Sequence, residues 1–81
     1  MVTAAQIRAA RALLGWSGAQ LAEAAGVALQ TIRRMESDLG PGRSSAANVE
    51  AVRRALEKAG VVFLEGDDTG TLGPGVRLRP A

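Results

Sequence analysis

The sequence predicts a small, mostly α-helical domain of four to five helices, followed by a short β segment. Apolar residues recur at intervals of three and four along residues 3–59, and glycines follow several of these runs. Residues 61–81 change to β-branched and alternating patterns. Because the chain has only 81 residues, we expect one helical domain over 1–60 with a C-terminal β segment over 61–81.

The composition restricts the chemistry that the chain can perform. Cysteine, histidine and tyrosine are absent, which excludes disulfides, thiolate nucleophiles, a Cys/His zinc site and imidazole acid–base catalysis. We therefore expect a binding module rather than an enzyme, with no metal and no cofactor. No apolar run approaches the roughly 20 residues of a membrane span, and the N-terminus lacks a secretion signal. The sequence accordingly indicates a cytoplasmic protein.

Two capping boxes predict the first two helices. In each box a hydroxyl residue precedes a glutamine by three positions, and the pairs are Thr3 with Gln6 and Ser17 with Gln20. The apolar pattern that follows each box stops at a glycine, Gly15 in the first case and Gly26 in the second. We predict helices over 3–14 and 18–25.

Helical spacing of apolar residues predicts two more helices, over 28–37 and 45–59. The segment 38–43 between them is made largely of turn residues. Either Ser44 or Ser45 can cap the last helix, because both side chains can accept a hydrogen bond from a free backbone N–H of the first turn.

Two short strands are predicted after the helices, over 61–64 and 76–79. The loop between them has about ten residues and is long for a hairpin, so the strands can pair within the chain or across a dimer. An unpaired strand edge invites a second chain, and two-fold symmetry is the commonest arrangement of two identical chains, so we favour the dimer. The apolar side chains expected to form this contact are Val61, Phe63, Val76 and Leu78.

Residues 18–37 have the plan of a helix-turn-helix motif. Ala22 is small enough for two helices to cross closely, and Gly26 can adopt the positive φ that the turn needs. The inner faces of the two helices carry apolar residues, namely Leu21, Val27, Ile32 and Met35. The outer face of the second helix carries Gln30, Arg33 and Arg34.

The chain resembles the Cro and phage-repressor family of bacterial helix-turn-helix regulators, also called the xenobiotic-response-element family. The resemblance covers about residues 4–60 and rests on three runs: Arg11-Ala-Leu-Leu-Gly-Trp-Ser17, Gln20-Leu-Ala-Glu-Ala-Ala-Gly-Val27 and Thr31-Ile-Arg-Arg-Met-Glu36. In this family the second helix of the motif lies in the major groove of double-stranded DNA. The resemblance therefore implies a lambda-repressor-like fold and DNA as the partner.

The resemblance also implies roles for individual residues. Those expected at base edges are Leu29, Gln30, Arg33 and Arg34. Those expected at phosphates are Arg8, Ser17, Thr31 and Arg43. Arg11 and Glu36 match a pair of charges that is structural in the family, so we exclude both from the base contacts.

The sequence also departs from the family pattern. Gly18 and Ala28 stand where the family commonly has a glutamine and a Ser or Thr, and Asp38 adds negative charge beside the expected interface. We expect a homodimeric, sequence-specific transcriptional regulator acting as a repressor. The departures favour an alternative, in which the scaffold is a protein-binding module that sequesters a second regulatory protein, as an antiactivator or antitoxin does.

Overall fold

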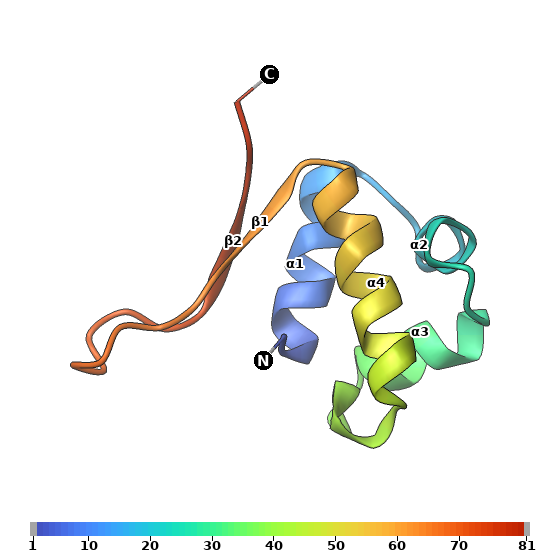
Figure 1. Cartoon of the computed structure of the whole chain (residues 1–81), viewed down its shortest axis with the longest axis horizontal. Coiled ribbons are helices and arrows are strands. Elements are labelled where there is room, and N and C mark those ends of the chain that lie inside the picture. Colours follow the sequence, from blue (N-terminus) through green and yellow to red (C-terminus); the bar gives the residue numbers. More distant parts are fainter. Residues whose placement is uncertain (1, 81) are drawn as a thin grey trace.

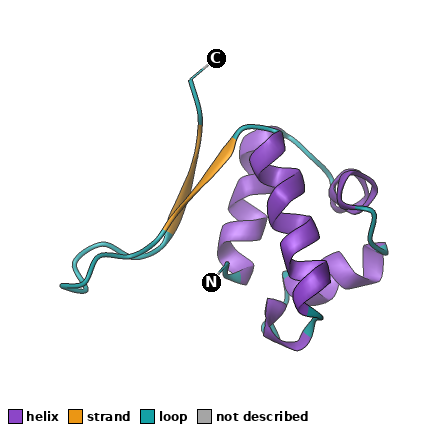
Figure 2. Cartoon of the chain, viewed as in Figure 1, coloured by secondary structure: helices purple, strands orange, loops and turns teal. Residues whose placement is uncertain are grey.

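The computed structural model describes residues 2–80, which form four α-helices, one 3-10 turn and a two-stranded sheet (Figures 1 and 2). The elements are, in chain order, α1 (Ala4–Leu14), α2 (Gly18–Ala25), α3 (Leu29–Met35), η1 (Pro41–Arg43), α4 (Ala46–Lys58), β1 (Val61–Leu64) and β2 (Gly75–Leu78). The predicted fold class, a mostly α-helical domain with a short C-terminal β segment, is confirmed.

Reciprocal capping boxes begin α1 and α2. The distances between backbone nitrogens and accepting side-chain oxygens are 2.9 and 3.1 Å for Thr3 with Gln6, and 2.7 and 3.1 Å for Ser17 with Gln20. Each helix ends at a left-handed glycine, Gly15 with φ 69° and Gly26 with φ 70°. Two backbone N–H groups at the start of each helix are thereby satisfied locally, which fixes where each helix begins.

The third helix is shorter than the predicted 28–37. At its start Ala28 is extended and has no side-chain oxygen to accept a hydrogen bond from the first turn. At its end Glu36 is the C-cap, and the Ser37 hydroxyl donates to the carbonyl oxygen of Arg34 at 2.6 Å. The chain therefore leaves the helix directly after Met35.

A short 3-10 turn, η1, occupies part of the segment that the sequence predicts as loop. Pro41 begins this turn and is buried. Of the two candidate caps for α4, Ser45 is the one used, because its side-chain oxygen accepts a hydrogen bond from the backbone nitrogen of Asn48 at 3.1 Å. The α3–η1–α4 connection is therefore ordered by a proline and a serine cap.

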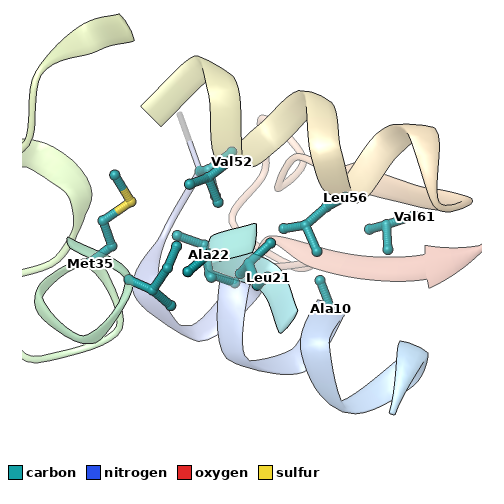
Figure 3. Packing of buried hydrophobic residues seen from close by; sticks show 10 residues of the cluster. Ala10, Leu21, Ala22, Met35, Val52, Leu56 and Val61 are labelled. Carbon is teal, nitrogen blue, oxygen red and sulfur yellow. The ribbon is translucent and has the colours of Figure 1, made fainter. Parts of the chain in front are cut away.

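The hydrophobic core lies where the four helices meet (Figure 3). Its buried members are Val2, Ile7, Ala10, Leu21, Ala22, Ile32, Met35, Val52, Leu56 and Val61. Among the residues predicted for the inner faces of the motif, Leu21, Ile32 and Met35 are fully buried. Val27 is half-buried and packs against the same cluster. This packing fixes the orientation of α3 against α2.

The two strands pair with each other within the chain. They are antiparallel, and Val61 lies opposite Leu78 while Phe63 lies opposite Val76. The sheet contacts α1 through β2 and α4 through β1, and its loop projects away from the helices (Figure 1). The strands therefore form a hairpin, and the favoured expectation that they pair across a dimer is wrong.

Gln6 attaches the hairpin to α1. Gln6 is only 4% exposed, and its Nε2 donates to the carbonyl oxygens of Leu64 and Gly75, each at 3.0 Å. Its Oε1 accepts from the Thr3 nitrogen in the capping box. One buried amide therefore bonds the start of α1, the end of β1 and the start of β2.

Candidate nucleic-acid interface

The outer face of α3 is the surface that the helix-turn-helix packing leaves open. Ile32 and Met35 are fully buried, so the side chains of Gln30, Arg33 and Arg34 point away from the core and are exposed. All three are residues that the sequence predicts at base edges. Because Ile32 and Met35 anchor α3 in the core, the three side chains project from a rigid helix and not from a loop.

Three arginines lie at this surface, two on α3 and one in η1. Among residues 2–80, no carboxylate lies within 4.0 Å of Arg33, Arg34 or Arg43, whereas Arg11, Arg53 and Arg54 are all in ion pairs. Arg43 is exposed in η1, which contacts α3. Exposed and uncompensated cations on adjacent elements create a positive surface that attracts polyanions. Asp38, also exposed, lies between α3 and η1 in the sequence.

Leu29 occupies a different environment from the other predicted base contacts. It is half-buried and packs against the core, and a Cβ added to Gly18 would lie 3.3 Å from its Cδ1. Glycine at position 18 therefore lets the start of α3 approach the start of α2 closely. From the sequence alone Gly18 is only the loss of a polar side chain, because the contact with Leu29 depends on the packing of α2 against α3.

Two predicted phosphate ligands lie at the starts of helices. Ser17 is exposed, and its side-chain oxygen accepts the Gln20 backbone N–H of the capping box at 3.1 Å, which leaves its hydroxyl hydrogen free to donate. Thr31 is half-buried on α3.

Arg11 and Glu36 form a bidentate ion pair that joins α1 to the end of α3. The Nε–Oε2 and Nη2–Oε1 distances are 2.6 and 2.8 Å, and the side chains are 25% and 11% exposed. Arg11 also donates to the carbonyl oxygen of Trp16 at 3.0 Å. Hydrogen bonding to Glu36 raises the pKa of Arg11 against the opposing effect of burial. The pair is directed into the helical body and away from the exposed face of α3.

Arg8 also joins α1 to the end of α3. Its Nη1 donates to the backbone carbonyl oxygen of Glu36, although the side chain as a whole is exposed. The guanidinium has further N–H groups. Arg8 therefore closes the last turn of α3 and retains donors directed to solvent.

Comparison with known proteins identifies the fold. A model of the helix-turn-helix family matches residues 7–60, a span that includes all of α2 and α3. The chain belongs to the Cro/C1-type helix-turn-helix family. No curated protein sequence matches it significantly. As a member of this helix-turn-helix family it is a DNA-binding transcriptional regulator, and the hairpin lies beyond the matched residues.

The four α-helices of the described chain are short. Within residues 2–80, none is long and apolar enough to span a lipid bilayer.

Proposed function

We propose that this helix-turn-helix protein is a homodimeric, sequence-specific repressor that places α3 in the major groove of double-stranded DNA. The observation that carries the proposal is the outer face of α3, where Gln30, Arg33 and Arg34 are exposed and both arginines lack an acidic partner among residues 2–80. An α-helix fits the major groove, and base edges there are read by such donors and acceptors.

Each polar side chain of this face suits a particular base edge. The amide of Gln30 can bond N6 and N7 of adenine, and the guanidinium of Arg34 can bond O6 and N7 of guanine. Each such bidentate contact contributes about 1–3 kcal/mol of discrimination between bases. Arg33 lies beside Arg34 and reaches an adjacent base, while the exposed part of Leu29 can contact a thymine methyl group.

The residues around this face supply contacts to the DNA backbone. In the proposed complex Ser17, Thr31 and Arg43 bind phosphates, and Arg8 does so with the N–H groups that it does not use for Glu36. These contacts orient the protein on DNA without reading its sequence. A repressor of this kind acts by occupying promoter DNA, which in a bacterial cell places it in the cytoplasm.

A dimer gives this small surface enough affinity and specificity. One α3 reads only a few base pairs, whereas two copies related by a two-fold axis read two half-sites about 34 Å apart. The expected operator is therefore an inverted repeat whose halves lie one helical turn apart.

Footprinting of the purified protein on DNA upstream of its own gene tests the proposal. We expect two protected half-sites about 10 base pairs apart, at a protein concentration that leaves other DNA unprotected. The logarithm of the binding constant should fall linearly with the logarithm of salt concentration, by about 0.9 for each phosphate contact. A uniform, salt-sensitive coating of all DNA would contradict sequence-specific recognition.

A second function is favoured by the junction between α2 and α3. There Ala28 offers no polar cap, and Leu29 packs over Gly18, so the start of α3 is more apolar than a phosphate-binding surface requires. In this alternative the scaffold sequesters a second regulatory protein. Recovery of a stoichiometric protein partner, together with no retention on DNA at low salt, would select the alternative over the repressor.

A further inference from the structure

The register of the hairpin determines which residues leave their backbone N–H and C=O groups unpaired at each edge. Arg79 donates its backbone N–H to the carbonyl oxygen of Gly60 at 2.8 Å, in the same register as the four strand pairs. Because antiparallel pairs alternate, residues 62 and 64 direct their N–H and C=O groups into the hairpin. Val61 and Phe63 therefore direct theirs outward from β1, and Val76 and Leu78 direct theirs outward from β2.

The β2 edge is protected against pairing with another strand. Pro74 and Pro80 lie two residues before Val76 and two residues after Leu78, so they occupy the next outward-directed positions and lack an N–H to donate. Arg77 stands at the centre of this edge, where an antiparallel copy of β2 would place a second Arg77 opposite it. Prolines and like charges are the devices that prevent edge-to-edge association.

The β1 edge has none of these features. Its residues are Val-Val-Phe-Leu, the outward-directed positions contain no proline, and the strand carries no charge. Among residues 2–80, no hydrogen bond beyond the hairpin ladder uses the backbone of Val61 or Phe63. The hairpin therefore has one protected edge and one edge that is competent to pair.

We propose that the β1 edge is the dimer interface, and that a second copy of this chain pairs its own β1 with it, antiparallel and centred on Val62. The result is a continuous sheet in the order β2, β1, β1′, β2′. This inference rests on the proposed homodimer and names its surface. It moves Val76 and Leu78, which the sequence analysis assigns to the dimer contact, to the outer strands of the joint sheet.

Self-pairing of β1 is favoured by side chains as well as by backbone groups. In this register the backbone of Val61, whose side chain is already buried in the core, pairs with that of Phe63 of the second copy, and the two half-buried Val62 side chains meet at the two-fold axis. A strand that pairs with itself in this way gives an isologous contact, which closes at two copies.

Charges at the ends of the strands are complementary in the same arrangement. The register brings the chain just beyond Leu64 to the end of α4 in the second copy. The acids Glu65, Asp67 and Asp68 then approach the exposed Lys58 of that copy. The two-fold axis repeats the contact at the other end of the joint strand pair, so opposite charges flank the apolar centre twice.

A pair of single-cysteine variants tests the interface directly, because the protein has no other cysteine. In the proposed dimer the two copies of residue 62 form a non-hydrogen-bonded pair with Cα atoms about 4.5 Å apart, a spacing that permits a disulfide. We expect Val62→Cys to form a covalent dimer rapidly under mild oxidation at low protein concentration. The matched control Arg77→Cys has the corresponding central position on β2 and should remain monomeric on non-reducing gels. Cross-linking of Arg77→Cys alone, of both variants equally or of neither would overturn the proposal.

A charge substitution gives an independent readout. Val62→Glu places a carboxylate opposite Arg77 within the hairpin, which is favourable, but two carboxylates face each other across the proposed axis. Sedimentation equilibrium should show a dimer dissociation constant raised about ten-fold or more, with an unchanged circular dichroism spectrum. An unaltered dimer constant in the folded variant would overturn the proposal.

The result can be separated from the test of DNA binding. Val62→Glu leaves α3 intact, so it should still bind a single half-site and lose only the cooperative binding of two. If the unmodified protein did not bind a half-site, the proposed function would be contradicted, but the cross-linking result would still test the dimer interface.

Discussion

The arginines of α1 and those of α3 are only a short distance apart in the fold, but the structure uses them in opposite ways. Arg8 and Arg11 both donate to Glu36. Arg33 and Arg34 are exposed and, within residues 2–80, have no carboxylate in reach. Arginines on α1 thus hold α3 in place, whereas the arginines on the outer face of α3 remain available for a partner. The difference follows from the face on which each arginine lies, not from the residue type.

The largest expected effect comes from breaking the ion pair between Arg11 and Glu36. Arg11→Ala removes a bidentate partner from Glu36, whose side chain is only 11% exposed, and leaves a carboxylate with reduced compensation. We expect the free energy of unfolding to fall by about 2–3 kcal/mol, which is less than for a fully buried pair, because Arg11 is partly exposed. Urea denaturation followed by circular dichroism measures this loss.

The double variant Arg11→Ala/Glu36→Ala serves as the control. It should lose less than the sum of the two single variants, because neither charge is left without its partner. Additive losses would show that the two side chains do not stabilise α3 through their contact.

The exposed arginines should behave in the reverse manner. Arg34→Ala is expected to weaken operator binding by about 1–3 kcal/mol and to relax the preference at one base position, while stability changes by no more than about 0.5 kcal/mol. Arg54→Ala is the matched control, since Arg54 is also exposed on a helix but pairs with Glu50 at 3.0 Å on α4. Fluorescence anisotropy with operator and base-substituted DNA measures both. Equal losses for the two variants would assign the effect to general charge and not to a contact made by α3.

Local signals predicted most of the helical fold. The capping residues Thr3 and Ser17 and the glycines Gly15 and Gly26 act within four positions in sequence, so the first two helices begin and end within about one residue of the predicted bounds. The burial of Ile32 and Met35 also follows from helical spacing, and the exposure of α3's outer face follows from the same pattern.

Features that depend on distant contacts could not be predicted. Gln6 bonds carbonyl groups 58 and 69 positions away, and nothing in its local sequence distinguishes this amide from an ordinary cap. The packing of Leu29 against Gly18 depends on how closely α2 and α3 approach. The strand pairing was open because a long loop permits both arrangements, and only the attachment of both strands to the helices selects the hairpin.

The smallest effect is expected where a charge is hydrogen-bonded but not buried. Asp67, in the hairpin loop, accepts the Leu72 backbone N–H at 3.0 Å and the Thr69 hydroxyl at 2.9 Å, and these bonds lower its pKa below 3.8. A depressed pKa in the folded state means that the stabilisation is present above pH 3.8 and is lost as pH falls through the folded value. Acidification should therefore loosen this loop before it affects the helices.

Hydrogen exchange separates this local effect from global stability. We expect the protection factor of the Leu72 amide to fall on acidification in the unmodified protein and to be low at every pH in Asp67→Ala, while the midpoint of global unfolding at neutral pH is unchanged. If Asp67→Ala instead lowered that midpoint as much as Arg11→Ala, the hydrogen bonds of a charged side chain would stabilise the fold whether or not the side chain is buried. The expected result assigns that contribution to burial, which Glu36 has and Asp67 lacks.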